Sequence, residues 1–154
     1  MGGSGFWRSG SGIIIRNASK GSKYYTTGSS GFVDVLDVVA VMIALMGSDI
    51  SNERFVLVSE NLTYKELLSA LAASFGNPPP TKAFKRSVFI WLCRLDAISS
   101  WLFGRKRRLL KSMVKSMYSK SVYSNEKIKR ELNFEFRPIT QTIERVVRNY
   151  SSSS

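Results

Sequence analysis

The stretch LTYKELLSALAASFG, residues 62–76, constrains the fold more strongly than any other part of the sequence. Thr63 is followed three residues later by Glu66, the spacing of a capping box, in which two side chains satisfy backbone N–H groups at the start of a helix. Apolar residues then recur at helical spacing as far as Phe75. Gly76 and the prolines at 78–80 oppose any continuation. The segment therefore predicts a helix with one apolar face, closed by Gly76.

Short strands are expected upstream of this helix. The run FVLV at 55–58 predicts a compact apolar strand. Lys23–Thr26 and Phe32–Val35 also have strand character, and the TGSSG between them has the chemistry of a turn. These two segments are therefore candidates for a hairpin. The three isoleucines at 13–15 suit either a strand, on propensity, or a short helix between Ser11 and Gly21.

Helices dominate the rest of the prediction. Asp34 or Asp37 leads into an apolar run at 38–46, which we expect to be a largely buried helix that ends at Gly47. Further helices are expected over residues 84–103, 108–118, 124–132 and 140–150, the third with Ser124 as its N-cap. The predicted fold is α+β, mostly helical, with strands too few for a doubly wound domain. The predicted helices and short strands therefore suggest elements that pack against a larger sheet, which these residues do not themselves form.

Composition excludes several classes of function. The 154 residues suit one domain, and the net charge of +12 raises nucleic acid or an anionic membrane as partners. The single Cys93, in an apolar stretch, allows no intrachain disulfide and is expected in the core. The absence of histidine removes Ser-His-Asp and Cys-His catalysis and the usual zinc sites, so no metal site is expected. With no signal peptide and no apolar run long enough for a bilayer, a cytoplasmic location is expected.

Three stretches carry a resemblance to a known family. GFVDVLDVV at 31–39 is similar to its F-V-D-V-x-D-V-A segment, and residues 55–68 are similar to its late strand and N-x-T-x-x-E-L motif. Residues 123–138 are similar to S-x-x-K-A-x-x-E-L-G-[FW]-x-P, with Asn133, which tolerates a left-handed conformation, in place of glycine. The chain thus resembles extended short-chain dehydrogenases/reductases, the NAD-dependent epimerase/dehydratase group with the dihydroflavonol reductase-like enzymes. The match, from Phe6 to Tyr150, is to their carboxyl-terminal, substrate-side portion.

The resemblance also suggests where a substrate would bind. Residues 5–11 are similar to the family's G-P-G-x-W-x-x-G-S segment, although Ser4 stands where the family has proline. The resemblance therefore implies that Phe6, Trp7 and Ser11 contact a small organic substrate. Composition alone favours a Gly/Ser-rich linker over residues 1–12 and a disordered serine tail over 151–154, and the resemblance implies that 13–150 form the substrate-side region.

The residues that would perform the family's chemistry are not recognisable here. The resemblance implies NAD or NADP as cofactor, but no Gly-rich turn follows a strand, so no cofactor-binding residue is assigned. The family's catalytic Tyr-x-x-x-Lys has one literal match, Tyr123 and Lys127, which falls in a late motif where Tyr123 is expected to precede the helix. We therefore assign no catalytic residue. Asp34 and Asp37 are interpreted as a capped strand-to-helix junction rather than an acid/base pair.

Two functional hypotheses follow. In the first, the chain is a carboxyl-terminal fragment of an NAD(P)-dependent oxidoreductase or epimerase, inactive alone, with exposed apolar helices that can self-associate. In the second, it is a basic helical module that binds an anionic membrane surface or nucleic acid. The second rests on the cluster RKRR at 105–108, continued by Lys111 and Lys115, beside Trp101 and Phe103. The alternative for this cluster is a solvated turn between helices.

Overall fold

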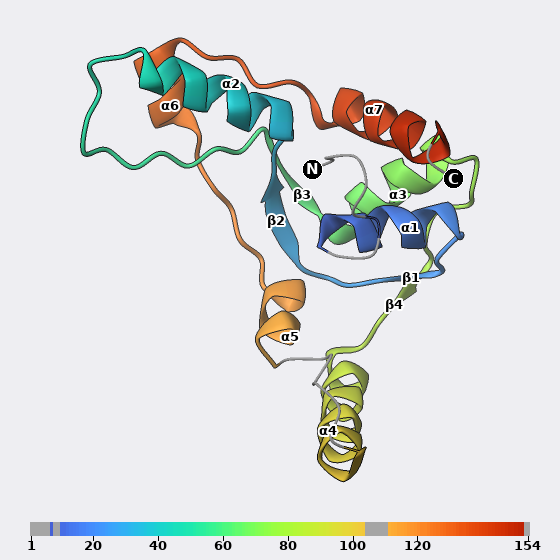
Figure 1. Cartoon of the computed structure of the whole chain (residues 1–154). Coiled ribbons are helices and arrows are strands. Elements are labelled where there is room, and N and C mark those ends of the chain that lie inside the picture. Colours follow the sequence, from blue (N-terminus) through green and yellow to red (C-terminus); the bar gives the residue numbers. More distant parts are fainter. Residues whose placement is uncertain (1–6, 8–9, 104–110, 153–154) are drawn as a thin grey trace.

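A computed structural model describes residue 7, residues 10–103 and residues 111–152, and the side chains at 97–103 and 111–113 are not discussed. The described residues form an α+β fold dominated by helices, as expected (Figure 1). The helices are α1 (Ser11–Ser19), α2 (Val35–Met46), α3 (Tyr64–Ser74), α4 (Arg86–Phe103), α5 (Lys111–Tyr118), α6 (Glu126–Leu132) and α7 (Ile139–Ser152). The strands are β1 (Tyr24–Tyr25), β2 (Ser29–Phe32), β3 (Glu60–Thr63) and β4 (Lys82–Ala83).

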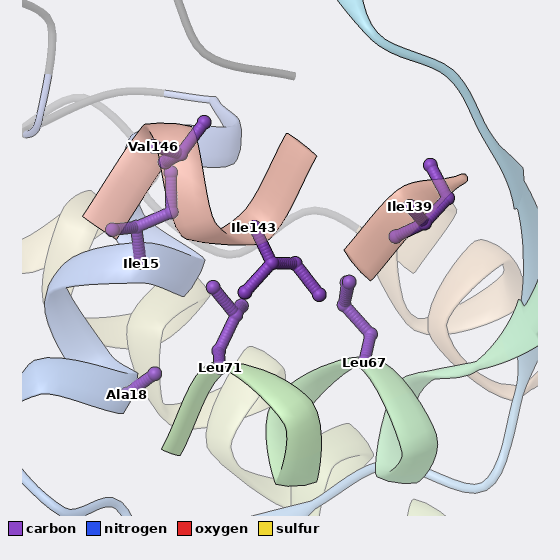
Figure 2. Close-up of a cluster of buried hydrophobic side chains, with 7 residues drawn as sticks. All are labelled: Ile15, Ala18, Leu67, Leu71, Ile139, Ile143 and Val146. Carbon is purple, nitrogen blue, oxygen red and sulfur yellow. The ribbon is translucent and has the colours of Figure 1, made fainter. Parts of the chain in front are cut away.

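The hydrophobic core lies where α1, α3 and α7 meet. Figure 2 shows side chains from these three helices directed toward one another. The buried cluster comprises Ile15, Ala18, Leu67, Leu71, Ile139, Ile143 and Val146. The first and last helices of the described chain therefore share one core with the central helix.

Helix α3 forms as its sequence predicts. The Thr63 hydroxyl accepts a hydrogen bond from the Glu66 N–H at 3.2 Å, and the Glu66 carboxylate accepts one from the Thr63 N–H at 2.8 Å. This is the expected capping box. At the other end Gly76 takes a φ of 71°, which favours glycine and ends the helix.

The strands do not pair as a hairpin, so that prediction is wrong. β1 lies parallel to β4, with Tyr24 opposite Lys82, and β2 lies antiparallel to β3, with Ser29 opposite Thr63. The expected turn is instead held by a distant segment, because the N–H groups of Gly28 and Ser29 donate to the carbonyls of Met117 (3.1 Å) and Ser119 (2.9 Å). β2 consequently starts inside the expected turn and ends at Phe32.

The expected strand at 55–58 is also absent. Within the described residues this segment has no strand partner, and β3 begins only at Glu60. Val58 is buried, whereas Val56 is 49% exposed. A strand needs a neighbour to take its backbone hydrogen bonds, and no neighbouring strand lies alongside this segment.

Helix α2 departs from its prediction in burial rather than in position. Asp34 caps it and Gly47 follows its end, but only Asp37 and Val41 are buried. Five of its large apolar side chains form what we call the α2 face, with exposures from 44% to 86%: Leu36, Val39, Met42, Ile43 and Met46. The expected burial is therefore wrong, because no described element covers the α2 face.

The structure also differs from expectation near both ends. The isoleucines at 13–15 lie in a helix, with Ile15 1% exposed against α3 and α7, so tertiary packing overrides their strand propensity. The linker prediction is wrong at Trp7, which packs on the core, and at Ser11 and Gly12, which begin α1. The predicted disordered tail is wrong at Ser151 and Ser152, which continue α7.

The remaining helices follow the predicted order. α4 extends away from the other elements and packs against α5 (Figure 1), and Cys93 is buried as expected. α6 begins one residue later than predicted: Asn125 is its N-cap, while the Ser124 hydroxyl accepts from the Glu126 N–H at 3.3 Å. Asn133 ends α6 at φ 47° and ψ 40°, the left-handed conformation expected of it.

Candidate functional site

A pocket of about 250 Å³ lies between α1, β1, α3 and the segments around α4 and α5. Its wall is mainly aromatic and aliphatic, with a few polar side chains, and we call it the aromatic pocket. The lining residues are Ile14, Asn17, Ser22, Tyr24, Tyr25, Thr26, Tyr64, Leu68, Phe84, Phe89 and Met117. Apolar walls with a few polar groups are typical of small-molecule sites, and this volume suits a single ring or a short apolar group.

A chain of edge-to-face aromatic contacts holds one wall of this pocket. The ring centroids of Tyr24 and Phe84 are 5.9 Å apart, and those of Phe84 and Phe89 are 5.8 Å apart. Phe89 continues the chain to Tyr118, whose hydroxyl donates to the Phe84 carbonyl at 2.6 Å. Parallel pairing of β1 with β4 brings Tyr24 and Phe84 together from positions sixty residues apart. This wall is therefore fixed by both backbone and side-chain contacts.

A second pocket, of about 300 Å³, adjoins the first and has a different chemistry. Hydroxyl groups dominate its wall, together with one ammonium group, and we call it the serine pocket. The lining residues are Ser29, Ser30, Tyr64, Lys115, Ser116, Ser119, Ser121 and Tyr123. Hydroxyls and a lysine ammonium can bind anionic or hydroxyl-rich groups, whereas no described lysine or arginine lines the aromatic pocket.

Tyr64 lines both pockets and stands between them. Its ring meets Phe32 edge to face at 6.1 Å, and its N–H donates to the Gly28 carbonyl at 3.0 Å. Burial raises the pKa of the Tyr64 phenol, and Tyr123 nearby raises that pKa further. The phenol therefore stays protonated at neutral pH and keeps its hydrogen-bond donor.

The backbone on one side of the serine pocket is packed too closely for any side chain at position 28. A Cβ atom on Gly28 would lie 2.8 Å from the Ser119 carbonyl oxygen and would also collide with the Met117 carbonyl. On the other side, the Asn61 side chain accepts from the Tyr123 N–H at 2.9 Å and donates to the Tyr123 carbonyl at 2.8 Å. Both contacts hold segment 117–123 against β2 and β3.

The two aspartates at the start of α2 are structural, as their sequence context predicted. Asp34 is 1% exposed and accepts two hydrogen bonds from Arg145, at 2.7 and 2.8 Å, and one from the Leu36 N–H at 2.8 Å. Burial alone would raise the pKa of Asp34, but the hydrogen bonds from Arg145 and Leu36 outweigh burial and lower it. Asp37 accepts from the Arg137 N–H at 2.9 Å and pairs with the Arg137 guanidinium at 3.2 Å. These contacts tie α2 to the chain that leads into α7.

Tyr123 and Lys127 are held by different parts of the chain. Tyr123 precedes α6 and lines the serine pocket, whereas Lys127 lies within α6. The Lys127 ammonium pairs with the Glu53 carboxylate and lies 5.0 Å from the centre of the Phe55 ring. The interactions recorded for Lys127 are therefore with residues 53–55, and the literal Tyr-x-x-x-Lys match does not form the shared helical face that this catalytic pair requires.

The residues expected to contact substrate do not line either pocket. Trp7 packs on the core, with its ring 5.0 Å from that of Tyr150 and its indole Nε1 buried without an acceptor among the described residues. Ser11 is exposed at the start of α1. Phe6 lies outside the described residues, as does the basic cluster at 105–108.

The described residues do not fit the pyrophosphate of a dinucleotide. Such a site needs a strand, a glycine-rich turn and a helix N-terminus with free N–H groups. Where β2 leads into α2, Asp34 and Asp37 already occupy the helix start, and where β3 leads into α3, Glu66 does so. These carboxylates would repel a phosphate. In the described part of the chain, no group of three or more potential metal ligands gathers, and no helix is long and apolar enough to cross a membrane.

Comparisons with known proteins place the fold. No family model and no curated protein matches the sequence. Among solved structures, the nucleoside-diphosphate-sugar epimerase PA4631 from Pseudomonas aeruginosa is similar over 94% of this chain, with a TM-score of 0.72 and 17% identity. WbmG from Bordetella bronchiseptica, in complex with NAD and UDP, is similar over 99% of this chain, with a TM-score of 0.64 and 13% identity. RMD from Pseudomonas aeruginosa, complexed with NADPH, is similar over 96% of this chain, with a TM-score of 0.59 and 13% identity.

These matches confirm the expected fold, which is like that of the carboxyl-terminal portion of extended short-chain dehydrogenases and epimerases. They cover 43%, 42% and 45% of the PA4631, WbmG and RMD chains, respectively. The present sequence therefore spans less than half the length of each of these proteins.

Both pockets went unrecognised in the sequence. Their residues come from five separate segments, and the motifs present in two of these segments, around Tyr64 and Tyr123, do not indicate a pocket. The one available signal was the adjacent pair of tyrosines at 24 and 25, because aromatic side chains commonly line small-molecule pockets.

Proposed function

We propose that this chain forms the substrate-side part of an NAD(P)-dependent oxidoreductase or epimerase that acts on a small organic molecule. The observation that carries the proposal is the match to PA4631 over 94% of this chain and only 43% of that protein. Structures similar to this chain contain NADPH or NAD. In this proposal the cofactor is held by residues outside the 154, because the β2–α2 and β3–α3 junctions, where a strand leads directly into a helix, carry carboxylates.

The exposed α2 face supports the proposal. Five apolar side chains on one helix are 44% to 86% exposed, and apolar patches of this kind are usually covered in the working protein. The apolar segment at 55–58 lacks a strand partner within the described residues. We propose that a cofactor-binding part covers both, and that region 13–150 closes the substrate against it.

The two pockets divide the substrate into two chemical halves. In this proposal the aromatic pocket takes an apolar or aromatic group, and the serine pocket takes an oxygen-rich or anionic group near Lys115. The Tyr64 phenol donates a hydrogen bond between them. Trp7 and Ser11 remain proposed contacts at the mouth of the complete site: the Trp7 Nε1 has a donor to offer, and no described side chain caps the α1 N-terminus beside Ser11.

An NMR titration of the isotopically labelled chain tests the proposal. Benzaldehyde and benzyl alcohol, as a carbonyl and alcohol pair, should shift amide signals around the aromatic pocket, whereas NADH and NADPH should produce no saturable change. Leu68→Trp, which fills the pocket, should abolish the response to the ring compounds. Ala73→Trp adds the same side chain at an exposed position of α3 and should leave the response intact.

Each outcome discriminates. Saturable binding of NADH or NADPH would show that the 154 residues hold a cofactor site, which contradicts the proposed division. Ring compounds that shift no signal, or that shift the Leu68→Trp variant equally, would remove the aromatic pocket as a substrate site.

A further inference from the structure

Helix α4 presents an apolar stripe to solvent. Val88, Trp91, Leu92 and Leu95 follow one another at the spacing of one helical face, and they are 46%, 65%, 41% and 44% exposed. We call these four residues the α4 stripe. A shallow hollow of about 300 Å³ lies among Ser87, Val88, Trp91 and Leu92. The stripe is therefore a continuous surface rather than a set of isolated side chains.

The opposite side of α4 is already packed. Cys93 is 6% exposed, Val114 on α5 is 3% exposed, and the Phe89 ring contacts Tyr118 at the end of α5. α4 is thus apolar on both sides, a pattern typical of a helix that is covered all round. Figure 1 shows that α4 extends away from α1, α2, α3 and α7, so none of these helices covers the stripe.

The stretch of sequence that contains this helix carries most of the positive charge of the protein. Residues 82–120, about a quarter of the chain, contain 11 of the 23 basic residues and only one of the 11 acidic residues, which gives a net charge of +10 out of +12. Lys85, Arg86 and Arg94, beside or between the stripe residues in sequence, are all exposed. The rest of the chain is nearly neutral. The apolar stripe therefore lies within the cationic segment of the sequence, with exposed Lys85, Arg86 and Arg94 close to it in the chain.

We propose that the α4 stripe binds the surface of an anionic lipid bilayer. An aromatic and aliphatic stripe flanked by arginine and lysine is the pattern of a helix that lies in the headgroup region, where apolar side chains enter the acyl boundary and cations meet phosphates. Arg94 and Lys85 supply the electrostatic part, and Trp91 supplies the interfacial anchor. The helix lies along the surface without crossing it.

Charge and chemistry favour lipid over other occupants. A second copy of the chain would bring its own +10 segment against the first, so like charges would oppose self-association through this helix. Single-stranded nucleic acid would contact the basic residues through its phosphates and the aromatic rings through its bases, but it would leave the aliphatic Val88, Leu92 and Leu95 without a partner. A bilayer matches both the charge and the aliphatic surface.

Flotation of the full chain with vesicles tests this proposal. Vesicles of phosphatidylcholine with 30% phosphatidylserine should carry the protein at low salt, and vesicles of pure phosphatidylcholine should carry much less. Trp91→Glu should lower the partition coefficient by about tenfold or more, because it removes a large apolar side chain from the contact. Arg94→Gln should lower it about fivefold.

The matched control lies on the α2 face. Met42→Glu places the same charge on an apolar residue of similar exposure, 56%, so it changes net charge equally but leaves the stripe intact. It should keep most of the binding, and circular dichroism should show native helix content in all variants. Failure of the wild-type chain to float with anionic vesicles would overturn the proposal. An equal loss of vesicle binding in Trp91→Glu and Met42→Glu would also overturn it. So would a chain that binds an oligonucleotide but no vesicles, if Trp91→Glu binds the oligonucleotide as tightly as the wild type does.

Discussion

Replacement of Asp34 by asparagine should cause a large loss of stability for so small a change in shape. The Asp34 carboxylate is 1% exposed and receives three hydrogen bonds, two of them from Arg145, whose own side chain is 30% exposed. Breaking a fully buried ion pair costs about 3–5 kcal/mol. Because Arg145 reaches solvent and asparagine can still accept from the Leu36 N–H, we expect about 2–3 kcal/mol for Asp34→Asn.

Urea denaturation followed by circular dichroism measures this loss. Glu53→Gln is the matched control, since it makes the same carboxylate-to-amide change in an ion pair whose partners are 45% and 49% exposed. It should cost much less than Asp34→Asn, because both partners of the Glu53 ion pair reach solvent. A loss below about 0.5 kcal/mol for Asp34→Asn, or equal losses in the two variants, would refute the argument that burial makes the Asp34–Arg145 pair important.

The pH dependence of this difference has a definite sign. The pKa of Asp34 is lowered in the folded state, so the stability that the carboxylate contributes is fully present above the unfolded pKa of about 3.9. The gap between wild type and Asp34→Asn should therefore be constant from pH 7 to about pH 5. It should shrink as the pH falls through 4 toward the folded pKa. A gap that widens on acidification would contradict the assignment.

Two further substitutions test the packing. Gly28→Ala should cost about 1–3 kcal/mol in urea denaturation, because the new Cβ meets the Ser119 carbonyl at 2.8 Å, whereas Gly47→Ala has no such neighbour closer than 3.8 Å and should be nearly neutral. If the two are equally tolerated, the segment at 117–119 is not packed against Gly28 as described. Leu71 is 1% exposed in the core, and Leu71→Ala should lower the free energy of unfolding by about 2–5 kcal/mol. Leu36→Ala, 44% exposed, should cost far less, and similar values for both would place the core elsewhere.

Local signals in the sequence were reliable where the interactions themselves are local. The capping box at Thr63 and Glu66, the left-handed Asn133 and the aspartate cap of α2 are all decided within a few residues. The sequence resemblance also predicted the fold correctly. These features depend on backbone chemistry that a short motif specifies.

Features that depend on distant partners were missed. Tyr24 and Tyr25 pair with residues 82 and 83, and Gly28 bonds to Met117, so the expected hairpin could not be judged from the turn sequence alone. The α2 face was expected to be buried because it is apolar, yet burial also requires a covering element. Both pockets form through such long-range contacts, and for this reason no sequence motif predicted them.

The sharing of one core by α1, α3 and α7 has a consequence for biosynthesis. Ile15 leaves the ribosome more than 120 residues before Ile139, Ile143 and Val146, which complete the cluster around it. Until α7 has emerged, α1 and α3 present a half-finished apolar surface, and long-range contacts of this kind form slowly. This core should therefore depend on chaperone protection while the residues between α1 and α7 are being made, and the fourteen-residue α7 completes the step that commits the core to the folded state.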